Sequence, residues 1–181
     1  MSVLEVIRAR RSIRRYRTDP VPDEVLYELL EAARWAPSSK NRQPWRFVIV
    51  KDSEKRRCLA ELCPYGRFLA ESPVVIVALS DPQESPRWHD KDTAIAVEHI
   101  VLAAAAKGLG TCWIGSFNEQ KVRELVGAPE HLQVVALLAL GYPAEEPPPR
   151  PRKPLTEIAF IEKYGQPFAP PADPRKDRCK S

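Results

Sequence analysis

The segment Ala36-Pro37-Ser38-Ser39-Lys40-Asn41-Arg42-Gln43-Pro44-Trp45 places short hydrogen-bonding side chains between two prolines and beside a tryptophan. Proline fixes its own φ and favours an extended conformation in the residue before it, so we expect Ala36 and Gln43 to be extended. A loop held in few conformations suits a polar, planar ligand, because preorganisation lowers the entropic cost of binding. Taken alone, an ordinary polar connection after a helix explains this polar loop equally well.

Arginines gather in a second segment, Arg8–Arg17, which carries six guanidinium groups in ten residues. A helix would wrap these charges around its axis with no acid before Asp19 to offset them, so a solvated helix face does not explain this arginine segment. We therefore expect an anion nearby. Phosphate suits arginine, because the planar guanidinium donates two hydrogen bonds and keeps its charge. The alternative is a nonspecific basic patch that binds nucleic acid.

Length and composition are those of one globular domain. The chain has 181 residues and a net charge of +4, concentrated in the arginine segment and the carboxy-terminal tail, which favours local anion sites. We find no signal-peptide pattern and no apolar stretch long enough to span a bilayer, so we expect a cytoplasmic protein. The cysteines form no Cys-x-x-Cys pair, which predicts reduced thiols and no metal site; they are Cys58, Cys63, Cys112 and Cys179.

Helical and strand-like patterns alternate along the chain, which predicts an α/β or α+β layered domain. The glycines at 108, 110 and 115 follow a predicted helix, whereas the dinucleotide-binding fingerprint follows a strand, and no Gly-Lys-Ser/Thr phosphate loop occurs. Phosphate would therefore have to be held by guanidinium groups. We expect helices over 22–35, 53–62, 92–109 and 118–126, strands over 47–50, 73–79 and 133–140, and a short extended piece over 111–115.

The predicted helix over 92–109 is apolar on nearly every side. Such a helix should be buried all round, which one small chain achieves with difficulty, so we expect part of it to pack against a second copy. Beyond the last strand, a proline-dense arm from Pro143 to Pro154 carries Arg150 and Arg152. Proline-rich segments are semi-rigid, so this arm could bring its arginines to a distant site.

Three blocks together resemble the flavin-dependent nitroreductases, a superfamily of nitro and flavin reductases. Their order and spacing match over almost the whole chain, although each block alone is weak. The resemblance implies an α+β, three-layer nitroreductase-like fold in which helices flank a central mixed, mostly antiparallel sheet. It also implies a domain-swapped homodimer with FMN at the subunit interface. We expect the FMN-binding domain to cover 1–165, and the polar, proline-rich composition of 166–181 predicts a tail. The blocks are 10–14, 37–45, and 108–115 followed by 140–143 and 152–155.

The resemblance assigns the two ends of the flavin to different residues. At the phosphate end, Arg14 would meet either the phosphate or the pyrimidine edge of the ring, and Arg152 matches better than Arg150. Gln43 is the less secure member of the partner-chain group, and a backbone N–H of the segment from Trp113 to Gly115 would lie near the reactive N5. The implied set is Arg10, Arg11, Ser12 and Arg14 with Arg150 and Arg152 for phosphate and ribityl chain; Ser38, Ser39, Asn41 and Gln43 from the partner; and Trp113, Ile114 and Gly115 at the ring.

The activity implied is that of an FMN-dependent oxidoreductase which passes hydride from NADH or NADPH through the flavin to electron-poor acceptors by a ping-pong mechanism. Nitroaromatics, quinones or flavins are the expected acceptors, no side chain is required as nucleophile or base, and neither nucleic acid nor membrane is an expected partner. The chain lacks the inserted helices of larger members, which leaves its acceptor range open. Alternatives are an FMN-dependent dehalogenation or flavin destruction, a flavin-binding protein without turnover, or a nucleic-acid-binding module.

Overall fold

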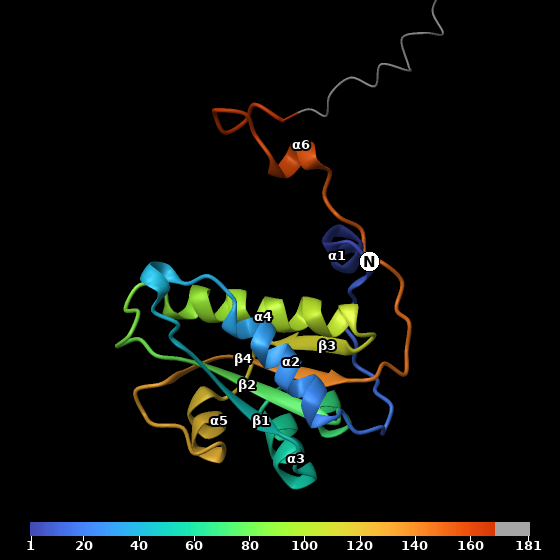
Figure 1. The fold of residues 1–181 in the computed structure, drawn as a ribbon, viewed down its shortest axis with the longest axis vertical. Helices are drawn as coiled ribbons and strands as arrows, with labels where there is room; N and C mark the ends of the chain where they lie inside the picture. Colours follow the sequence, from blue (N-terminus) through green and yellow to red (C-terminus); the bar gives the residue numbers. More distant parts are fainter. Residues whose placement is uncertain (169–181) are drawn as a thin grey trace, which may run out of the picture. The chain divides into compact units, whose positions relative to one another are not determined.

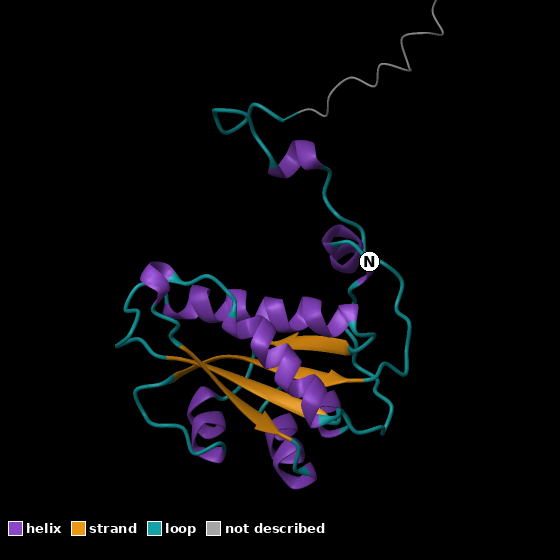
Figure 2. Cartoon of the chain, viewed as in Figure 1, coloured by secondary structure: helices purple, strands orange, loops and turns teal. Residues whose placement is uncertain are grey.

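The structure is a computed structural model that describes residues 1–168 and divides the chain into two compact units, Met1–Pro147 and a second that begins at Pro148. In the first unit, helices lie on both faces of a four-stranded sheet (Figures 1 and 2). The elements are helices α1 (Val3–Ala9), α2 (Asp23–Arg34), α3 (Ser53–Glu61), α4 (His89–Ala106), α5 (Glu119–Leu125) and α6 (Leu155–Ile158), 3₁₀ helices η1 (Ser39–Asn41) and η2 (Arg67–Ala70), and strands β1 (Trp45–Val50), β2 (Val74–Ser80), β3 (Gly110–Ile114) and β4 (Gln133–Gly141).

The sheet has the strand order β1-β2-β4-β3, and each neighbouring pair is antiparallel. Within residues 1–168, parallel pairing is limited to an isolated bridge between Ser12 and Thr111. This bridge joins the arginine segment to the edge of β3. The α+β, three-layer fold expected from the sequence is confirmed.

Two hydrophobic cores lie on opposite faces of the sheet, because successive residues of a strand point to opposite sides. On β2, Val75 and Val77 belong to the core beneath α3 and α5, whereas Val74 and Ile76 belong to the core beneath α2 and α4. All seven residues of β2 are buried, as expected of a strand covered on both faces. Figure 2 shows α2 and α4 on one side of the sheet and α3 and α5 on the other.

Helix α4 begins and ends three residues earlier than predicted. The chain leaves the helix through Gly108, whose φ of 75° is costly for any residue with a side chain. Within the single chain, α4 is not buried all round: Ala96, Val97 and Ile100 are fully buried, but Ile95 is 39% exposed. The single chain therefore covers one face of α4 and leaves apolar surface on another.

The other predicted helices are found within two residues of their expected ends, and β1 begins two residues earlier than expected, at Trp45. Helix α1 had no predicted counterpart, since its seven residues give too short a pattern; Ser2 and Glu5 form a capping box at its start. The domain boundary expected after residue 165 remains a prediction. Most of the tail predicted over 166–181 lies outside the described residues. Among residues 1–168, no helix combines the length and apolar character needed to cross a bilayer.

Candidate functional site

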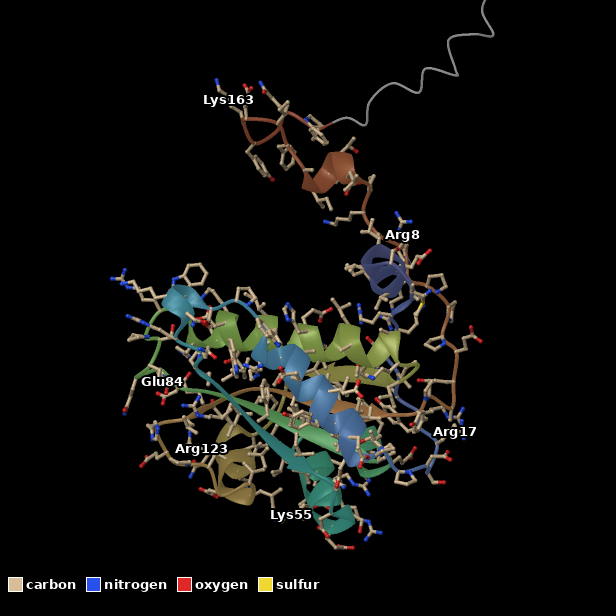
Figure 3. All side chains as sticks on the ribbon, in the orientation of Figure 1. Arg8, Arg17, Lys55, Glu84, Arg123 and Lys163 are labelled. Carbon is tan, nitrogen blue, oxygen red and sulfur yellow. The ribbon has the colours of Figure 1, made fainter. Side chains whose placement is uncertain are left out.

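The arginine segment is held against the sheet by backbone hydrogen bonds. The N–H of Ile13 donates to the carbonyl of Thr111 over 2.9 Å, and the N–H of Arg17 donates to the carbonyl of Tyr142 over 2.9 Å. These bonds span the ends of β3 and β4, so the segment runs as an added edge of the sheet. The arginines from Arg11 to Arg17 are thereby carried by the sheet edge, whereas Arg8 belongs to α1 (Figure 3, where Arg8 and Arg17 are labelled).

A close approach of the Gly110 backbone to the side chain of Ile13 fixes this edge. A Cβ placed on Gly110 would lie 2.6 Å from Cγ1 of Ile13, so the position requires glycine. The buried Tyr16 hydroxyl donates to the carbonyl of Ile13 over 2.5 Å, and burial raises the pKa of Tyr16. The phenol therefore stays protonated and keeps this hydrogen bond throughout the physiological pH range.

Glu145 ties the same segment to the chain beyond β4. One carboxylate oxygen, Oε1, accepts the backbone N–H of Arg14 over 2.6 Å and that of Arg15 over 3.2 Å. Because these donors are main-chain groups, the carboxylate orients the backbone and does not consume the Arg14 and Arg15 guanidinium groups. The guanidinium group of Arg11 already makes hydrogen bonds within the chain. Its Nη1 donates to the carbonyls of Arg8, Ala9 and Arg10 at the end of α1.

A cavity of about 580 Å³ opens beside the arginine segment. This volume is within the usual range for small-molecule and cofactor sites, roughly 300–1,000 Å³. Arg10 and Arg11 line one wall, and the turn from Gly108 to Thr111 lines another. Nε of Arg10 lies 4.0 Å from Oε1 of Glu98, a distance that leaves its fork of donors available to a ligand.

The polar loop adopts a backbone that few sequences tolerate. Lys40, Asn41 and Gln43 have φ values of 53°, 56° and 51°, in the left-handed region. Each such residue costs about 1–2 kcal/mol unless it is glycine, and strain of this kind is concentrated at functional sites. The expectation that Gln43 is extended is therefore wrong: its N–H donates to Oγ of Ser38 over 3.0 Å, and this turn outweighs the local preference imposed by Pro44.

A buried carboxylate holds the polar loop on α4. Asp92 is 2% exposed, and both of its oxygens lie 3.2 Å from the backbone N of Ser39. The hydroxyl of Ser85 donates to the same carboxylate over 3.3 Å. A buried charge needs hydrogen bonds to offset its lost hydration, so Asp92 and the loop stabilise each other.

The two candidate regions lie at opposite ends of α4. The polar loop is attached at Asp92, whereas the cavity beside the arginine segment is lined by Ala105. Thirteen residues of helix separate these positions, or about 20 Å at 1.5 Å per residue. In Figure 3, Glu84, near the loop, lies across the molecule from Arg8 and Arg17. One chain therefore does not bring Ser38, Ser39 or Asn41 to the arginines.

The predicted ring-contacting residues sit at the end of β3. The side chain of Ile114 is buried in the core beneath α5, so Ile114 can meet a ligand only through its backbone. Trp113 is half-buried and packs into the opposite core, beneath α4. Gly115 is exposed, and nothing lies within 4 Å of a Cβ placed there, which leaves its backbone accessible.

Arg150 and Arg152 belong to the second unit, where both are exposed. Nη1 of Arg152 donates to the carbonyls of Arg150 and Pro151. Their predicted role at a phosphate stays a prediction.

Sequence reasoning missed the two acids that shape these regions. Glu145 is 131 positions from Arg14, and no local pattern links such distant residues. Asp92 lies in the first turn of α4, where an acid normally serves to complement the helix dipole at the surface. Its burial could be recognised only once the loop was placed over it.

Comparison with known proteins identifies the class. The model of the Nitroreductase family matches residues 7–64 and 61–142, so the chain belongs to the nitroreductase family. An NADH dehydrogenase of Thermus thermophilus is 35% identical over 187 residues, which cover 83% of this chain and 91% of that protein. An FMN reductase [NAD(P)H] of Bacillus subtilis is 30% identical over 184 residues, covering 90% and 74%.

A solved structure agrees with the fold as well as with the sequence. The FMN-dependent nitroreductase of Clostridium difficile R20291 superimposes with a TM-score of 0.83 and 30% identity, over 89% of this chain and 99% of that one. The resemblance stated from the sequence is thus confirmed.

Proposed function

We propose that this protein is an FMN-dependent oxidoreductase that takes two electrons from NADH or NADPH and delivers them to an electron-poor acceptor. The observation that carries the proposal is the cavity of about 580 Å³ between the arginine segment and the turn from Gly108 to Thr111. Relatives described as an FMN reductase [NAD(P)H] and an FMN-dependent nitroreductase support the choice of cofactor and donor.

The residues around the cavity fit a phosphorylated, planar group. Arg10 supplies a guanidinium fork suited to phosphate, and Gly108 and Gly110 line the cavity without a side chain that would occupy it. Arg14 would place a positive charge at the phosphate or at the pyrimidine edge of the ring, where it would favour an anionic form. FMN, when bound, supplies the two-electron chemistry, so the protein has to bind and orient it and control its charge.

A homodimer would complete the site. The polar loop and the arginine segment are about 20 Å apart in one chain, and α4 between them leaves Ile95 exposed. Two copies related by a two-fold axis across α4 would pair these apolar faces and run the helices in opposite directions. Each polar loop would then lie near the arginine segment of the other copy, which supports Ser38, Ser39 and Asn41 as contributions from the partner.

The overall reaction is balanced without a catalytic side chain. For a nitroaromatic acceptor, the nitro group takes up two electrons and two protons and becomes a nitroso group with release of water. NAD(P)H supplies a hydride, which carries both electrons and one proton, and solvent supplies the second proton. Donor and acceptor would occupy the same pocket in turn, which gives ping-pong kinetics and parallel initial-rate lines. The cytoplasmic location expected from the sequence stays a prediction.

The visible spectrum of the purified protein tests the proposal. Protein reconstituted with FMN should retain the yellow colour of oxidised flavin after gel filtration, elute with the mass of a dimer, and bleach when NADH or NADPH is added under anaerobic conditions. Addition of a nitroaromatic or quinone should restore the colour. A monomer that fails to retain added FMN would contradict the proposal, as would bound flavin that neither nicotinamide cofactor reduces.

A further inference from the structure

A second hollow lies along the arginine segment, separate from the cavity described above. It measures about 400 Å³, and its lining includes Arg14, Arg15 and Arg67 together with the aromatic residues Tyr65 and Phe68. We refer to it as the arginine cleft. Arg10 and Arg11 line the first cavity, whereas Arg14 and Arg15, further along the same segment, line the arginine cleft.

The positive charges of the arginine cleft are not neutralised within residues 1–168. The guanidinium groups of Arg14, Arg15 and Arg67 form no ion pair and no hydrogen bond in the described part of the chain. Glu71 also lines the cleft but is not paired with any of them. Glu145 also lies nearby, bonded to the backbone N–H groups of Arg14 and Arg15. Three cations near these two carboxylates still leave an excess of positive charge, which attracts an anion.

Aromatic surface accompanies these charges. The guanidinium carbon of Arg14 lies 6.0 Å from the centroid of the Phe68 ring. Tyr65 is 81% exposed, a large apolar side chain left in contact with solvent. A planar ligand could pack against these rings while its charged group meets the arginines, and both interactions would act on the same molecule.

A tight turn holds Tyr65 and Phe68 in place. The N–H of Gly66 donates to the carbonyl of Cys63 over 2.9 Å, and the N–H of Leu69 donates to the carbonyl of Gly66 over 2.9 Å. A Cβ on Gly66 would lie 2.4 Å from Cβ of Cys63, so the turn closes against the end of α3. The aromatic side of the arginine cleft is therefore built on a fixed backbone.

We propose that the arginine cleft is the part of the acceptor site that selects planar aromatic compounds carrying an anionic group, with Arg67 as a specificity-determining residue. This inference rests on the proposed function and deepens it. Arg14 lines the arginine cleft, and Arg10 and Arg11, four and three positions earlier on the same segment, line the first cavity. Arg14 is also the side chain expected to reach the flavin. An acceptor over the ring would place its anionic substituent among Arg14, Arg15 and Arg67.

A matched pair of acceptors tests the inference: 4-nitrobenzoate is anionic and 4-nitrobenzamide is its neutral counterpart. FMN-loaded protein reduced with dithionite would be mixed anaerobically with each, and the second-order rate of flavin reoxidation measured. We expect a wild-type preference for 4-nitrobenzoate of about tenfold, typical of a charge-assisted contact. Arg67→Gln should lower this preference ratio to about one. Arg57→Gln is the control, because Arg57 is exposed, pairs with Glu54 and lies outside the arginine cleft.

A binding measurement provides a readout that does not depend on turnover. Oxidised protein would be titrated calorimetrically with 2-naphthoate and with 2-naphthamide, neither of which accepts electrons from the flavin. Wild-type protein and Arg57→Gln should bind the carboxylate more tightly than the amide, and increasing salt should weaken only carboxylate binding. Arg67→Gln should bind both ligands with similar affinity.

The outcomes separate the two proposals. If neither of these acceptors nor a quinone reoxidises the flavin, the proposed function fails, and the naphthoate titration still decides whether the arginine cleft binds anions. If both acceptors react equally in wild-type protein and Arg67→Gln, the inference is wrong while the proposed function stands. If Arg67→Gln slows reduction by NADPH relative to NADH and leaves the acceptor ratio unchanged, the cleft holds the 2′-phosphate of the donor, and the inference is overturned.

Discussion

The arginine segment at one end of α4 and the polar loop at the other are stabilised in different ways. The arginine segment is part of the sheet edge, with backbone hydrogen bonds to Thr111 and Tyr142 and glycine at position 110. The polar loop depends on the Asp92 carboxylate and contains three residues with positive φ. Disturbing the first region should therefore affect the global stability of the protein, whereas disturbing the second should mainly affect the binding site.

Gly110→Ala should have the largest effect on stability. The added methyl would approach the side chain of Ile13 to within 2.6 Å, so the arginine segment would have to move away from β3. We expect the free energy of unfolding to fall by about 1–3 kcal/mol, measured by urea denaturation. Gly115→Ala is the control, since nothing lies within 4 Å of the new methyl. Equal stability of both variants would show that the close approach does not hold the edge.

Asp92→Ala should weaken cofactor binding. The Ser39 N–H and the Ser85 hydroxyl would lose their acceptor, which costs about 1–3 kcal/mol. We expect the Kd for FMN, measured by quenching of flavin fluorescence, to rise by about tenfold or more. Asp90→Ala removes an exposed carboxylate from the same helix and should leave the Kd unchanged. An unchanged Kd in Asp92→Ala would separate the loop from the cofactor site.

Substitutions by glycine within the polar loop should have smaller effects of opposite sign. Lys40→Gly removes a left-handed penalty of about 1–2 kcal/mol and adds a backbone entropy cost of about 0.5–1 kcal/mol. Scanning calorimetry should therefore show an unchanged or slightly raised Tm. Arg42, with φ −75° and ψ −23°, has an ordinary backbone, so Arg42→Gly should lower the Tm. Equal changes in both variants would mean that the loop stores no strain.

Alkylation of the cysteines should show whether the arginine segment has moved away from β3, and this is the smallest of the expected effects. Burial raises the pKa of the Cys112 thiol, on β3 beside this segment, and raises that of Cys63 to about 11. Residue-resolved mass spectrometry should show that iodoacetamide at pH 8 modifies the exposed Cys58 and spares these two. Gly110→Ala should expose Cys112 to alkylation, and Asp92→Ala should not. Alkylation of Cys112 in both variants would show that the two regions do not open independently.

Alkaline pH should destabilise the protein through the buried Cys63 thiol. The pKa of Cys63 in the folded protein, about 11, is above its ordinary value of 9.0, so folding favours the neutral thiol. This contribution to stability is fully present below pH 9 and is lost as the pH rises towards 11. Urea midpoints measured from pH 8 to pH 11 should decline less steeply in Cys63→Ser than in the wild-type protein.

Much of the fold could be predicted because its signals are local. The apolar run over β2 and the pattern over α2 each depend on neighbouring residues, and both elements lie within one or two residues of their expected ends. The conformation of Gln43 could not be predicted in this way. The preference imposed by Pro44 is local, but the hydrogen bond from Gln43 to Ser38 and the attachment of the loop to Asp92 involve more distant residues.

In the candidate site, too, some features follow from the local sequence and others only from the tertiary structure. The sequence by itself determined which residue types are present: the guanidinium groups of Arg8–Arg17, the short polar side chains of the loop and the glycines around β3. Only the tertiary structure decided that Glu145 orients Arg14, that Asp92 holds Ser39, and that the two regions lie at opposite ends of one helix. The physical reason is that composition and periodicity act over one or two turns of chain, whereas a buried carboxylate finds its hydrogen-bond donors in space, across 53 positions for Asp92 and 131 for Glu145.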